Sequence, residues 1–263
     1  MRPFITDRKI EAAQFTSKWV TPGDMKALAR KLIGRKILSI GRRGKYILIQ
    51  LDEGVLTMHL GMTGKLLVQG SVDEHTHGVF GLSHAKHGEG VLLYHDPRQF
   101  GSIEWSPAEN PRVTRLGPEP LDISFDEFLA RFKGKSGVRK VGMKALLLNQ
   151  AFLAGLGNIY ADESLFAAGI HPLTSAAKIA SPRSRARAER LYQAIRAILS
   201  RAIEVGGSSI SDYVNAEGER GWFQIEHKVY GREGEPCANC GGPIRKVLVA
   251  QRGTHFCPRC QKK

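Results

Sequence analysis

Two cysteine pairs near the C-terminal end constrain the fold of this chain most strongly. Cys237-Ala-Asn-Cys240 and Cys257-Pro-Arg-Cys260 contain all four cysteines, and residues 241–256 separate the pairs. Two CxxC pairs at this separation are typical of a structural zinc site, because each pair bends into a tight turn that aims two thiolates at one metal ion. A segment of about 35 residues is too small to fold on an apolar core alone, so we expect zinc to stabilise it. Disulfides are the alternative, but nothing else indicates a secreted protein.

The charge balance favours a polyanionic partner. Thirty-nine Lys and Arg against 25 Asp and Glu give a formal net charge of +14, and such an excess promotes nucleic-acid binding through phosphate contacts. No basic amphipathic segment stands apart to indicate membrane-surface binding. No apolar run approaches the roughly 18 residues of a membrane span, and residues 1–9 lack an apolar signal core. We therefore expect a cytoplasmic protein.

Residues 1–115 are predicted to form a β-sandwich. Strand-like apolar patterns occupy residues 47–51, 55–60, 65–68 and 90–94, with Gly-rich turns between them. Short strands at this spacing are typical of two packed sheets. One helix is expected early, over residues 25–33, where Thr21-Pro22-Gly23-Asp24 precedes an apolar stripe at helical spacing.

Residues 116–228 are predicted to be helical, and residues 229–263 form the zinc ribbon, which makes the chain an α+β protein. Two helices are expected near 143–154 and 159–168, separated by a Gly-Leu-Gly-Asn turn. A longer helix is expected after Ser181-Pro182, and Gly206-Gly207 would end it.

Six segments of the chain carry distinctive motifs. They are Arg-Arg-Gly-Lys-Tyr at 42–46, His-Leu-Gly-Met-Thr-Gly at 59–64, Asp-Pro-Arg-Gln-Phe-Gly at 96–101, Leu-Gly-Pro-Glu-Pro-Leu at 116–121, Gly-Leu-Gly-Asn-Ile-Tyr-Ala-Asp-Glu at 155–163, and the four-cysteine ribbon with Ala-Gln-Arg at 250–252. Together they resemble one family, the bacterial formamidopyrimidine-DNA glycosylases. The resemblance implies a two-layered β-sandwich, a helix–two-turn–helix domain and a zinc finger. It also implies one structural zinc, damaged duplex DNA as the partner, action as a monomer, and a nucleoid-associated location in a bacterial cytoplasm.

The resemblance places Lys45 and Arg252 in the catalytic machinery. In the family, the lysine at the position of Lys45 donates a proton during β-elimination, and the arginine at the position of Arg252 enters the minor groove and assists δ-elimination. Without the resemblance, both would be assigned to a solvated basic surface. The family's histidine at the position of His75 contacts DNA. A second metal site built from nearby histidines is a weaker alternative, because no acidic or cysteine ligand completes it.

The resemblance also implies a set of DNA contacts. Together with His75, its members are Met62, Arg98, Phe100, Arg139, Lys144 and Asn158. Met62, Arg98 and Phe100 would fill the gap that a flipped base leaves in the duplex, although Met62 and Phe100 taken alone would be assigned to the core. Arg139 or its neighbour Lys140, with Lys144 and Asn158, would contact phosphates. Asn158 suits that role because N–H groups are exposed where a helix begins.

The start of the chain departs from the family pattern. Family members begin Pro-Glu-Leu-Pro-Glu-Val-Glu, and the terminal proline amine is their nucleophile. Here the sequence begins Met1-Arg2-Pro3-Phe4-Ile5, so the N-terminal Pro and Glu are absent. The nitrogen of Pro3 lies in a peptide bond and cannot form an iminium. We expect a start codon assigned too late, with a real truncation or an inactive paralogue as the alternative, and we expect the chain as it stands to be inactive.

These features predict a base-excision repair enzyme that removes oxidised purines and cleaves the strand by β,δ-elimination through a Schiff base. Two alternatives stay open: an endonuclease VIII-like glycosylase for oxidised pyrimidines, and a non-catalytic protein that binds damaged DNA. Residues 116–121 and the polar loop at 214–227 argue against the first alternative. Residues 208–223 match the family segment that closes over the flipped base.

Overall fold

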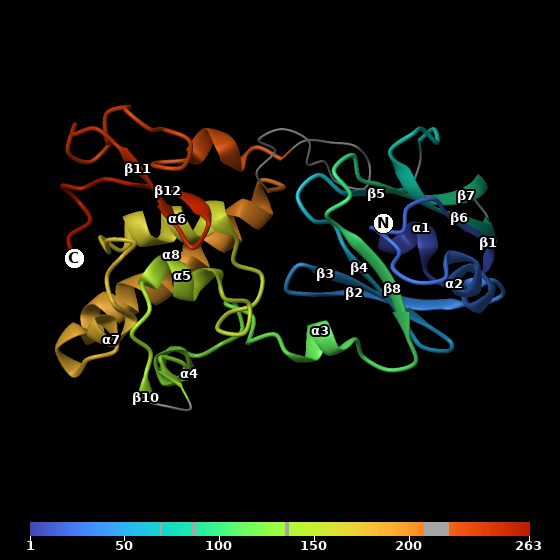
Figure 1. Ribbon diagram of the computed structural model, residues 1–263, viewed down its shortest axis with the longest axis horizontal. Helices are drawn as coiled ribbons and strands as arrows, with labels where there is room; N and C mark the ends of the chain where they lie inside the picture. Colours follow the sequence, from blue (N-terminus) through green and yellow to red (C-terminus); the bar gives the residue numbers. More distant parts are fainter. Residues whose placement is uncertain (69, 86–87, 135–136, 208–220) are drawn as a thin grey trace. The chain divides into compact units, whose positions relative to one another are not determined.

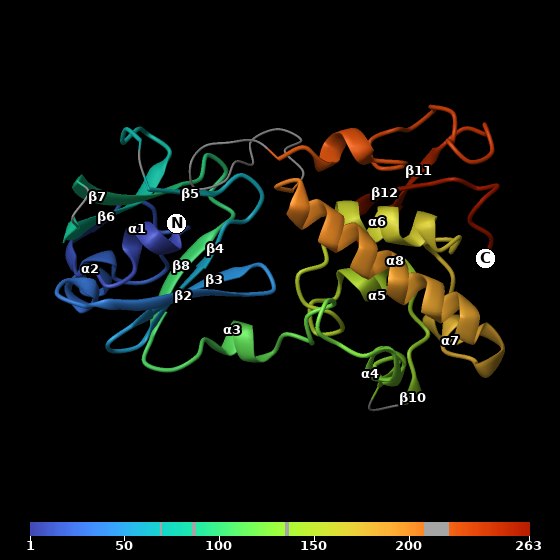
Figure 2. The same cartoon turned by 180° about the vertical axis from the view of Figure 1, so that it is seen from behind.

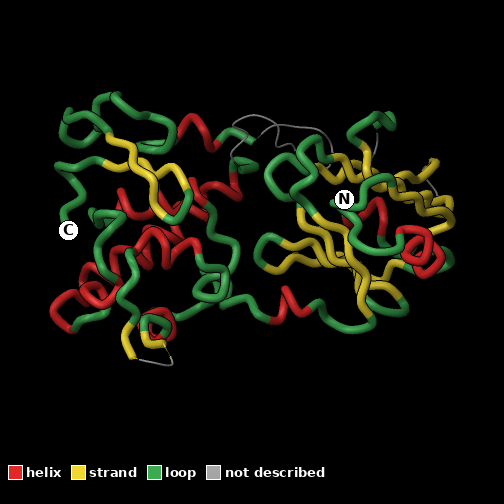
Figure 3. The backbone as a smooth tube through the Cα atoms, viewed as in Figure 1, coloured by secondary structure: helices red, strands yellow, loops and turns green. Residues whose placement is uncertain are grey.

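The computed structural model describes residues 1–68, 70–85, 88–134, 137–207 and 221–263 (Figure 1). The chain divides into two compact units. The first comprises Met1–Arg115 with Gly206–Trp222, and the second comprises Leu116–Val205 with Phe223–Lys263. Strands dominate the first unit and helices dominate the second (Figure 3). The predicted α+β class, with a sandwich, a helical region and a four-cysteine ribbon, is confirmed.

The first unit is built on two four-stranded antiparallel sheets. The strands of one sheet, in spatial order, are β1 (Ile10–Phe15), β6 (Thr76–Ala85), β7 (Gly88–His95) and β5 (Lys65–Leu67). The strands of the other are β2 (Ile37–Arg43), β3 (Tyr46–Leu51), β4 (Val55–His59) and β8 (Ser102–Ser106). Helices α1 (Arg2–Ile5), α2 (Met25–Leu32) and α3 (Pro111–Thr114) belong to this unit.

One apolar core joins the two sheets of the first unit. Phe80 and Leu92 of one sheet and Ile49 and Leu56 of the other belong to a single buried cluster. The alternation that predicted the strands therefore places their apolar faces against each other. Helix α2 begins where the sequence predicted, because the Asp24 side chain accepts a hydrogen bond from the backbone N–H of Ala27 and caps it.

The second unit packs its helices around α6 and α8. The helices are α4 (Phe125–Ala130), α5 (Met143–Leu148), α6 (Asn158–Ala167), α7 (Ala176–Ile179) and α8 (Arg185–Glu204), with 3-10 turns at Pro182–Ser184 and Phe223–Glu226 and a short pair of strands, β9 (Lys133–Gly134) and β10 (Gly137–Val138). Helix α6 contacts α5, α8 and the last strand of the chain, and Figure 2 shows α8 running beneath it. Within the described residues, no helix has the length and apolar composition needed to cross a bilayer.

The ribbon is an antiparallel hairpin of β11 (Arg245–Val249) and β12 (Arg252–Phe256). Its two turn residues, Ala250 and Gln251, have φ angles of 49° and 60°. Left-handed values at both positions match the twist of a two-residue hairpin, although glycine and asparagine are the usual residues there. The hairpin therefore holds non-glycine residues in a conformation that costs some free energy.

One predicted helix is wrong in its extent. Residues 143–154 were expected to be helical, but α5 ends at Leu148. Beyond Leu148, the side-chain amide of Gln150 takes the place of backbone hydrogen bonds of a helix. Its oxygen accepts the N–H of Gly155, and its nitrogen donates to the carbonyls of Leu148 and Leu156. Residues 152–154 are still buried, so their apolar pattern reflects the core and not a helix. The predicted loop contacts at 208–220 lie outside the described residues.

Candidate metal centre and nucleic-acid contacts

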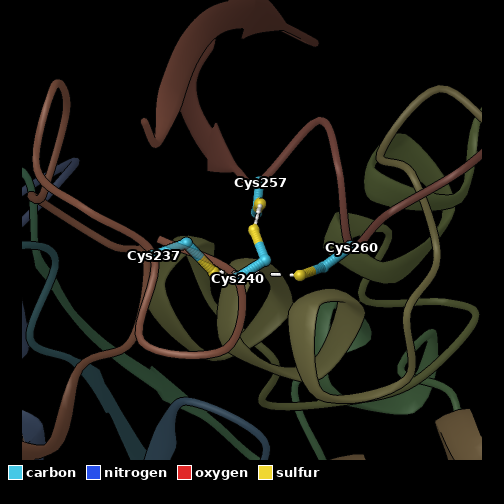
Figure 4. A group of neighbouring side chains, drawn as sticks. All are labelled: Cys237, Cys240, Cys257 and Cys260. Carbon is cyan, nitrogen blue, oxygen red and sulfur yellow. Dashed lines mark hydrogen bonds between the residues drawn. The ribbon is translucent and has the colours of Figure 1, made fainter. Parts of the chain in front are cut away.

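The four cysteines converge at the base of the ribbon (Figure 4). Their sulfur atoms all lie within 4.8 Å of one another, with Sγ–Sγ distances of 3.8 Å between Cys237 and Cys260 and 3.5 Å between Cys240 and Cys257. A tetrahedral zinc with Zn–S bonds of about 2.3 Å separates its sulfur ligands by about 3.8 Å. Among the described residues, this is the one group with metal-ligand geometry. The arrangement fits one structural zinc, as the sequence predicted.

Hydrogen bonding favours the thiolate form at one corner of this site. The backbone N–H of Gly242 is the main cause that lowers the pKa of Cys240 to about 7. Burial raises the pKa of Cys257 and of Cys260. Four crowded thiols cannot all ionise without a cation, and Zn²⁺ supplies the charge that stabilises four thiolates together.

The three side chains expected to fill the gap in the duplex lie on two adjoining loops, residues 60–64 and 96–101, which we call the wedge platform. Met62 is 56% exposed and Phe100 is 58% exposed, so neither is a core residue. The guanidinium of Arg98 lies 4.8 Å from the centre of the Phe100 ring. The platform thus presents two apolar side chains and one cation to solvent, a combination suited to a base-pair step.

The two loops of the wedge platform touch through glycines. A Cβ on Gly61 would lie 2.7 Å from the backbone of Phe100 and Gly101. A Cβ on Gly101 would overlap the Tyr94 hydroxyl, which donates to the carbonyl of His59. The glycines of both family segments are therefore required for close approach of the loops. Between them, Gln99 takes a left-handed φ of 54°, and Ser17 donates to its side chain.

Lys45 is exposed at the turn between β2 and β3, in the same unit as the wedge platform. Burial, followed by the positive charges of Lys45 and Arg112, lowers the pKa of His59. The Nδ1 atom of His59 accepts the backbone N–H of Gly61 at 3.0 Å, which requires that this nitrogen carry no proton. The cationic side chains thus help to keep His59 neutral and bonded to the platform.

His75 is half-buried on the segment before β6. Its ring packs against that of His95, with ring centroids 5.6 Å apart. The carboxylate of the nearby Asp73 accepts the backbone N–H of His75 and bonds to the Nε2 atom of His95. The backbone carbonyl of His75 accepts the N–H of Asp96. These bonds fix the position of His75, and its contact with DNA stays a prediction.

Lys144, a predicted phosphate contact, lies inside the second unit, and its contact with DNA stays a prediction. Its side chain is fully buried, and Nζ lies 2.5 Å from Oδ1 of Asp162 and 2.8 Å from the carbonyl of Asn158. Burial lowers the pKa of Lys144, and Asp162 opposes that shift. The ammonium is committed to partners inside the protein, so a direct phosphate contact would require it to leave them.

Asn158 occupies the first turn of α6, and Gly157 is the N-cap residue. Its side-chain N–H donates to the carbonyl of Gly253 in the ribbon at 3.0 Å, while its Oδ1 is buried with no partner among the described residues. The start of the helix and the ribbon hairpin are therefore joined directly. Arg252 is exposed beside the hairpin turn. Arg139 is half-buried, and its Nε donates to the carbonyl of Arg131.

Two acidic residues at the end of the 155–163 motif, to which the sequence assigned no role, hold the ribbon against α6. Asp162 is fully buried, and its Oδ2 accepts the backbone N–H of His255 at 3.0 Å. The carboxylate of Glu163 accepts three backbone N–H groups, those of Lys228, Val229 and Tyr230. We call Asp162 and Glu163 the ribbon anchor. In the sequence, the signal for this structural role was a pair of adjacent acidic residues within an apolar helix of a basic protein.

Sequence families cover most of the chain. The N-terminal domain family of formamidopyrimidine-DNA glycosylases matches residues 1–103, their H2TH domain family matches residues 116–214, and the zinc finger family found in FPG and IleRS matches residues 234–263. The glycines, the wedge platform and the cysteine cluster described above all fall within these matches.

Individual relatives agree with the families. The formamidopyrimidine-DNA glycosylase of Solibacter usitatus is 51% identical over 98% of this chain and 94% of the relative, and that of Bordetella parapertussis is 44% identical over 98% and 92%. Among solved structures, the MutM (Fpg) protein of Thermus thermophilus superposes with a TM-score of 0.84 at 38% identity, over 98% of this chain and 93% of that one. A Lactococcus lactis Fpg variant in complex with Fapy-dG-containing DNA gives 0.85 at 33% identity, over 100% and 95%. The chain therefore belongs to the formamidopyrimidine-DNA glycosylase family.

Proposed function

We propose that this protein removes oxidised purines, such as 8-oxoguanine and formamidopyrimidines, from duplex DNA in base excision repair. One observation carries the proposal: Met62, Arg98 and Phe100 lie exposed on a platform of close-packed loops. Exposed apolar side chains beside a cation are costly to keep unless they meet a partner, and a duplex with one base turned out is such a partner. The relatives' name, and a neighbour bound to Fapy-dG DNA, support the same substrate class.

In the proposed DNA complex, each unit has its own task. Lys45 contributes positive charge and a transferable proton beside the platform, and Arg252 supplies a cation at the tip of the ribbon. The backbone N–H groups at the start of α6 form a phosphate seat with Asn158. The zinc holds the ribbon folded, so its chemistry is structural and no reaction step depends on it.

The proposed reaction needs a free amine at C1′ of the damaged nucleotide. The amine nitrogen attacks C1′ and loses its proton, while the base leaves with the electron pair of the glycosidic bond and takes up a proton. The nitrogen lone pair then forms the iminium as the C1′–O4′ bond breaks, and O4′ leaves with that electron pair and takes up a proton. Pro3 cannot serve in a polypeptide that begins at Met1, because its nitrogen is an amide within α1. We therefore propose that such a polypeptide binds lesion DNA without cleaving it, and that a Pro-Glu-Leu-Pro-Glu start restores strand cleavage.

The test compares lesions in one duplex sequence. Binding and strand cleavage are measured on duplexes that carry 8-oxoguanine, dihydrouracil or no lesion. Preference for 8-oxoguanine is expected, whereas preference for dihydrouracil would support the endonuclease VIII-like alternative. Equal affinity for all three duplexes would contradict the proposed function.

Borohydride trapping then separates an enzyme from a non-catalytic binder. We expect no covalent product from the polypeptide that begins at Met1 and a trapped product from the version with the restored start. Robust trapping by the first polypeptide would show that an amine other than a terminal proline can form the iminium. Lesion preference without trapping in either version would identify a protein that binds damage without cutting.

A further inference from the structure

We propose that Asp96 is the positioning residue of the wedge platform: its buried carboxylate fixes the geometry of both loops without taking part in the chemistry. This inference rests on the proposed function, because it concerns the side chains that would enter the duplex. Asp96 itself is 0% exposed, so it cannot touch DNA while the platform keeps its present structure.

The two carboxylate oxygens of Asp96 bind one loop each. Oδ1 accepts the hydroxyl of Thr63, the residue after Met62, at 2.7 Å. Oδ2 accepts the backbone N–H of Gly101, the residue after Phe100, at 2.9 Å. The carboxylate thus links the neighbours of both exposed apolar side chains across the contact that Gly61 and Gly101 make possible.

The backbone of Asp96 adds two further links. Its N–H donates to the carbonyl of His75 at 2.9 Å, and its carbonyl accepts the N–H of Gln99 at 3.1 Å. The second bond closes the tight turn that carries Arg98 and brings Gln99 to its left-handed conformation. One residue therefore connects the three segments that hold the predicted DNA contacts of this unit.

The chemistry of the donors indicates a role in geometry and not in charge. Both donors to the carboxylate, a hydroxyl and a backbone amide, are neutral. An asparagine at position 96 could satisfy both, since its oxygen would accept the Gly101 N–H and its amide would donate to the Thr63 hydroxyl, which is also an acceptor. An alanine would leave the Gly101 N–H buried and unpaired, which favours opening of the loop.

The experiment measures lesion preference, defined as the affinity for an 8-oxoguanine duplex divided by that for the undamaged duplex. Asp96→Ala is expected to lower this ratio about tenfold, the scale of a lost hydrogen bond to a charged group. Asp96→Asn should retain most of it. Thr63→Val should lower it by a smaller factor, because only one of the two links is lost.

Thr57→Val is the matched control. Thr57 is a buried threonine of β4 whose hydroxyl has no partner among the described residues, so the same substitution leaves the platform intact. Hydrogen exchange at residues 60–64 and 96–101 adds a readout that needs no DNA, and exchange there should accelerate in Asp96→Ala and Thr63→Val only.

Each contrary outcome is distinct. Unchanged hydrogen exchange and unchanged lesion preference in Asp96→Ala would overturn the inference. An Asp96→Asn variant as impaired as Asp96→Ala would also overturn it, because the charge of the carboxylate would then be the property that matters. If Asp96→Ala does not fold, equal behaviour of Thr63→Val and Thr57→Val overturns it. A wild-type chain without lesion preference, but with faster exchange in the variants, would refute the proposed function and leave the positioning role standing.

Discussion

The wedge platform of the first unit and the ribbon anchor of the second both depend on buried carboxylates. They differ in the exposure of the predicted DNA contacts beside them, which are exposed in the platform and buried in the anchor. In the platform, Asp96 lies inside and Met62 and Phe100 point to solvent. In the anchor, Asp162 binds Lys144 inside the protein, so this predicted phosphate contact helps to hold the anchor carboxylate in place. Similar motif evidence thus led to exposed side chains in one unit and to a buried ion pair in the other.

The partners of each carboxylate explain the difference. Asp96 accepts from neutral donors that belong to the loops it connects. Asp162 accepts the His255 N–H on one oxygen and faces a cation on the other. Burial of a carboxylate is tolerated where hydrogen bonds or a counter-charge replace its lost hydration. Asp96 accepts two hydrogen bonds from neutral donors, whereas Asp162 combines one such bond with the ammonium of Lys144.

Zinc removal should have the largest effect, and it should disorder the ribbon while the wedge platform keeps its structure. Chelation, or Cys257→Ser, is expected to abolish the ordered ribbon, because the metal supplies most of the folding free energy of such a small segment. Zinc content per chain should fall from one, and DNA affinity should drop as Arg252 loses its support. Hydrogen exchange in the wedge platform should not change. Full zinc content in Cys257→Ser would contradict the four-cysteine site.

Breaking the buried ion pair should have the next largest effect. Asp162→Asn leaves the Lys144 ammonium buried without a counter-charge, so the free energy of unfolding should fall by about 3–5 kcal/mol. Denaturant titration measures this change. The control is Asp126→Asn, which removes the exposed pair with Arg185 and should have little effect. Equal, small losses in both variants would show that Lys144 is not charged in the folded protein.

Phe100→Ala should change recognition and leave stability nearly intact. The ring is 58% exposed, so its removal loses little burial, but stacking of an aromatic ring on a base contributes about 1–3 kcal/mol. Lesion preference should therefore fall about tenfold, with a smaller loss of affinity for undamaged duplex. Trp19→Ala, at another exposed aromatic residue of the same unit, is the control. Equal losses on both duplexes would remove Phe100 from lesion recognition.

The smallest effect concerns pH. Because the pKa of His59 is lowered in the folded state, the unfolded chain binds more protons near the ordinary pKa of about 6.5. The contribution of His59 to stability is therefore complete above that pH and is lost as pH falls below it. His59→Asn, whose side-chain oxygen can still accept the Gly61 N–H, should flatten the decline in thermal stability between about pH 7 and pH 5. A decline of unchanged slope would assign the effect to other histidines.

The sequence by itself determined the architecture. Apolar alternation predicted the strands around 47–51 and 55–60, the segment 21–24 before an apolar stripe predicted the start of α2, and two CxxC pairs predicted the zinc ribbon. These signals are local or repeat at a fixed spacing, so they can be seen without knowing the neighbours in space. Family motifs also identified the exposed Met62, Arg98 and Phe100.

Only the tertiary structure decided which polar motif residues face the solvent and which support the fold. Asp96 meets Thr63 from a distant loop, and Asp162 and Glu163 meet backbone groups of the ribbon far along the chain. Asp162 also holds Lys144 inside the protein, and side-chain bonds of Gln150 accompany the early end of α5. Whether a charged side chain is exposed depends on partners that the fold brings to it, because burial is tolerated only where hydrogen bonds and counter-charges replace water.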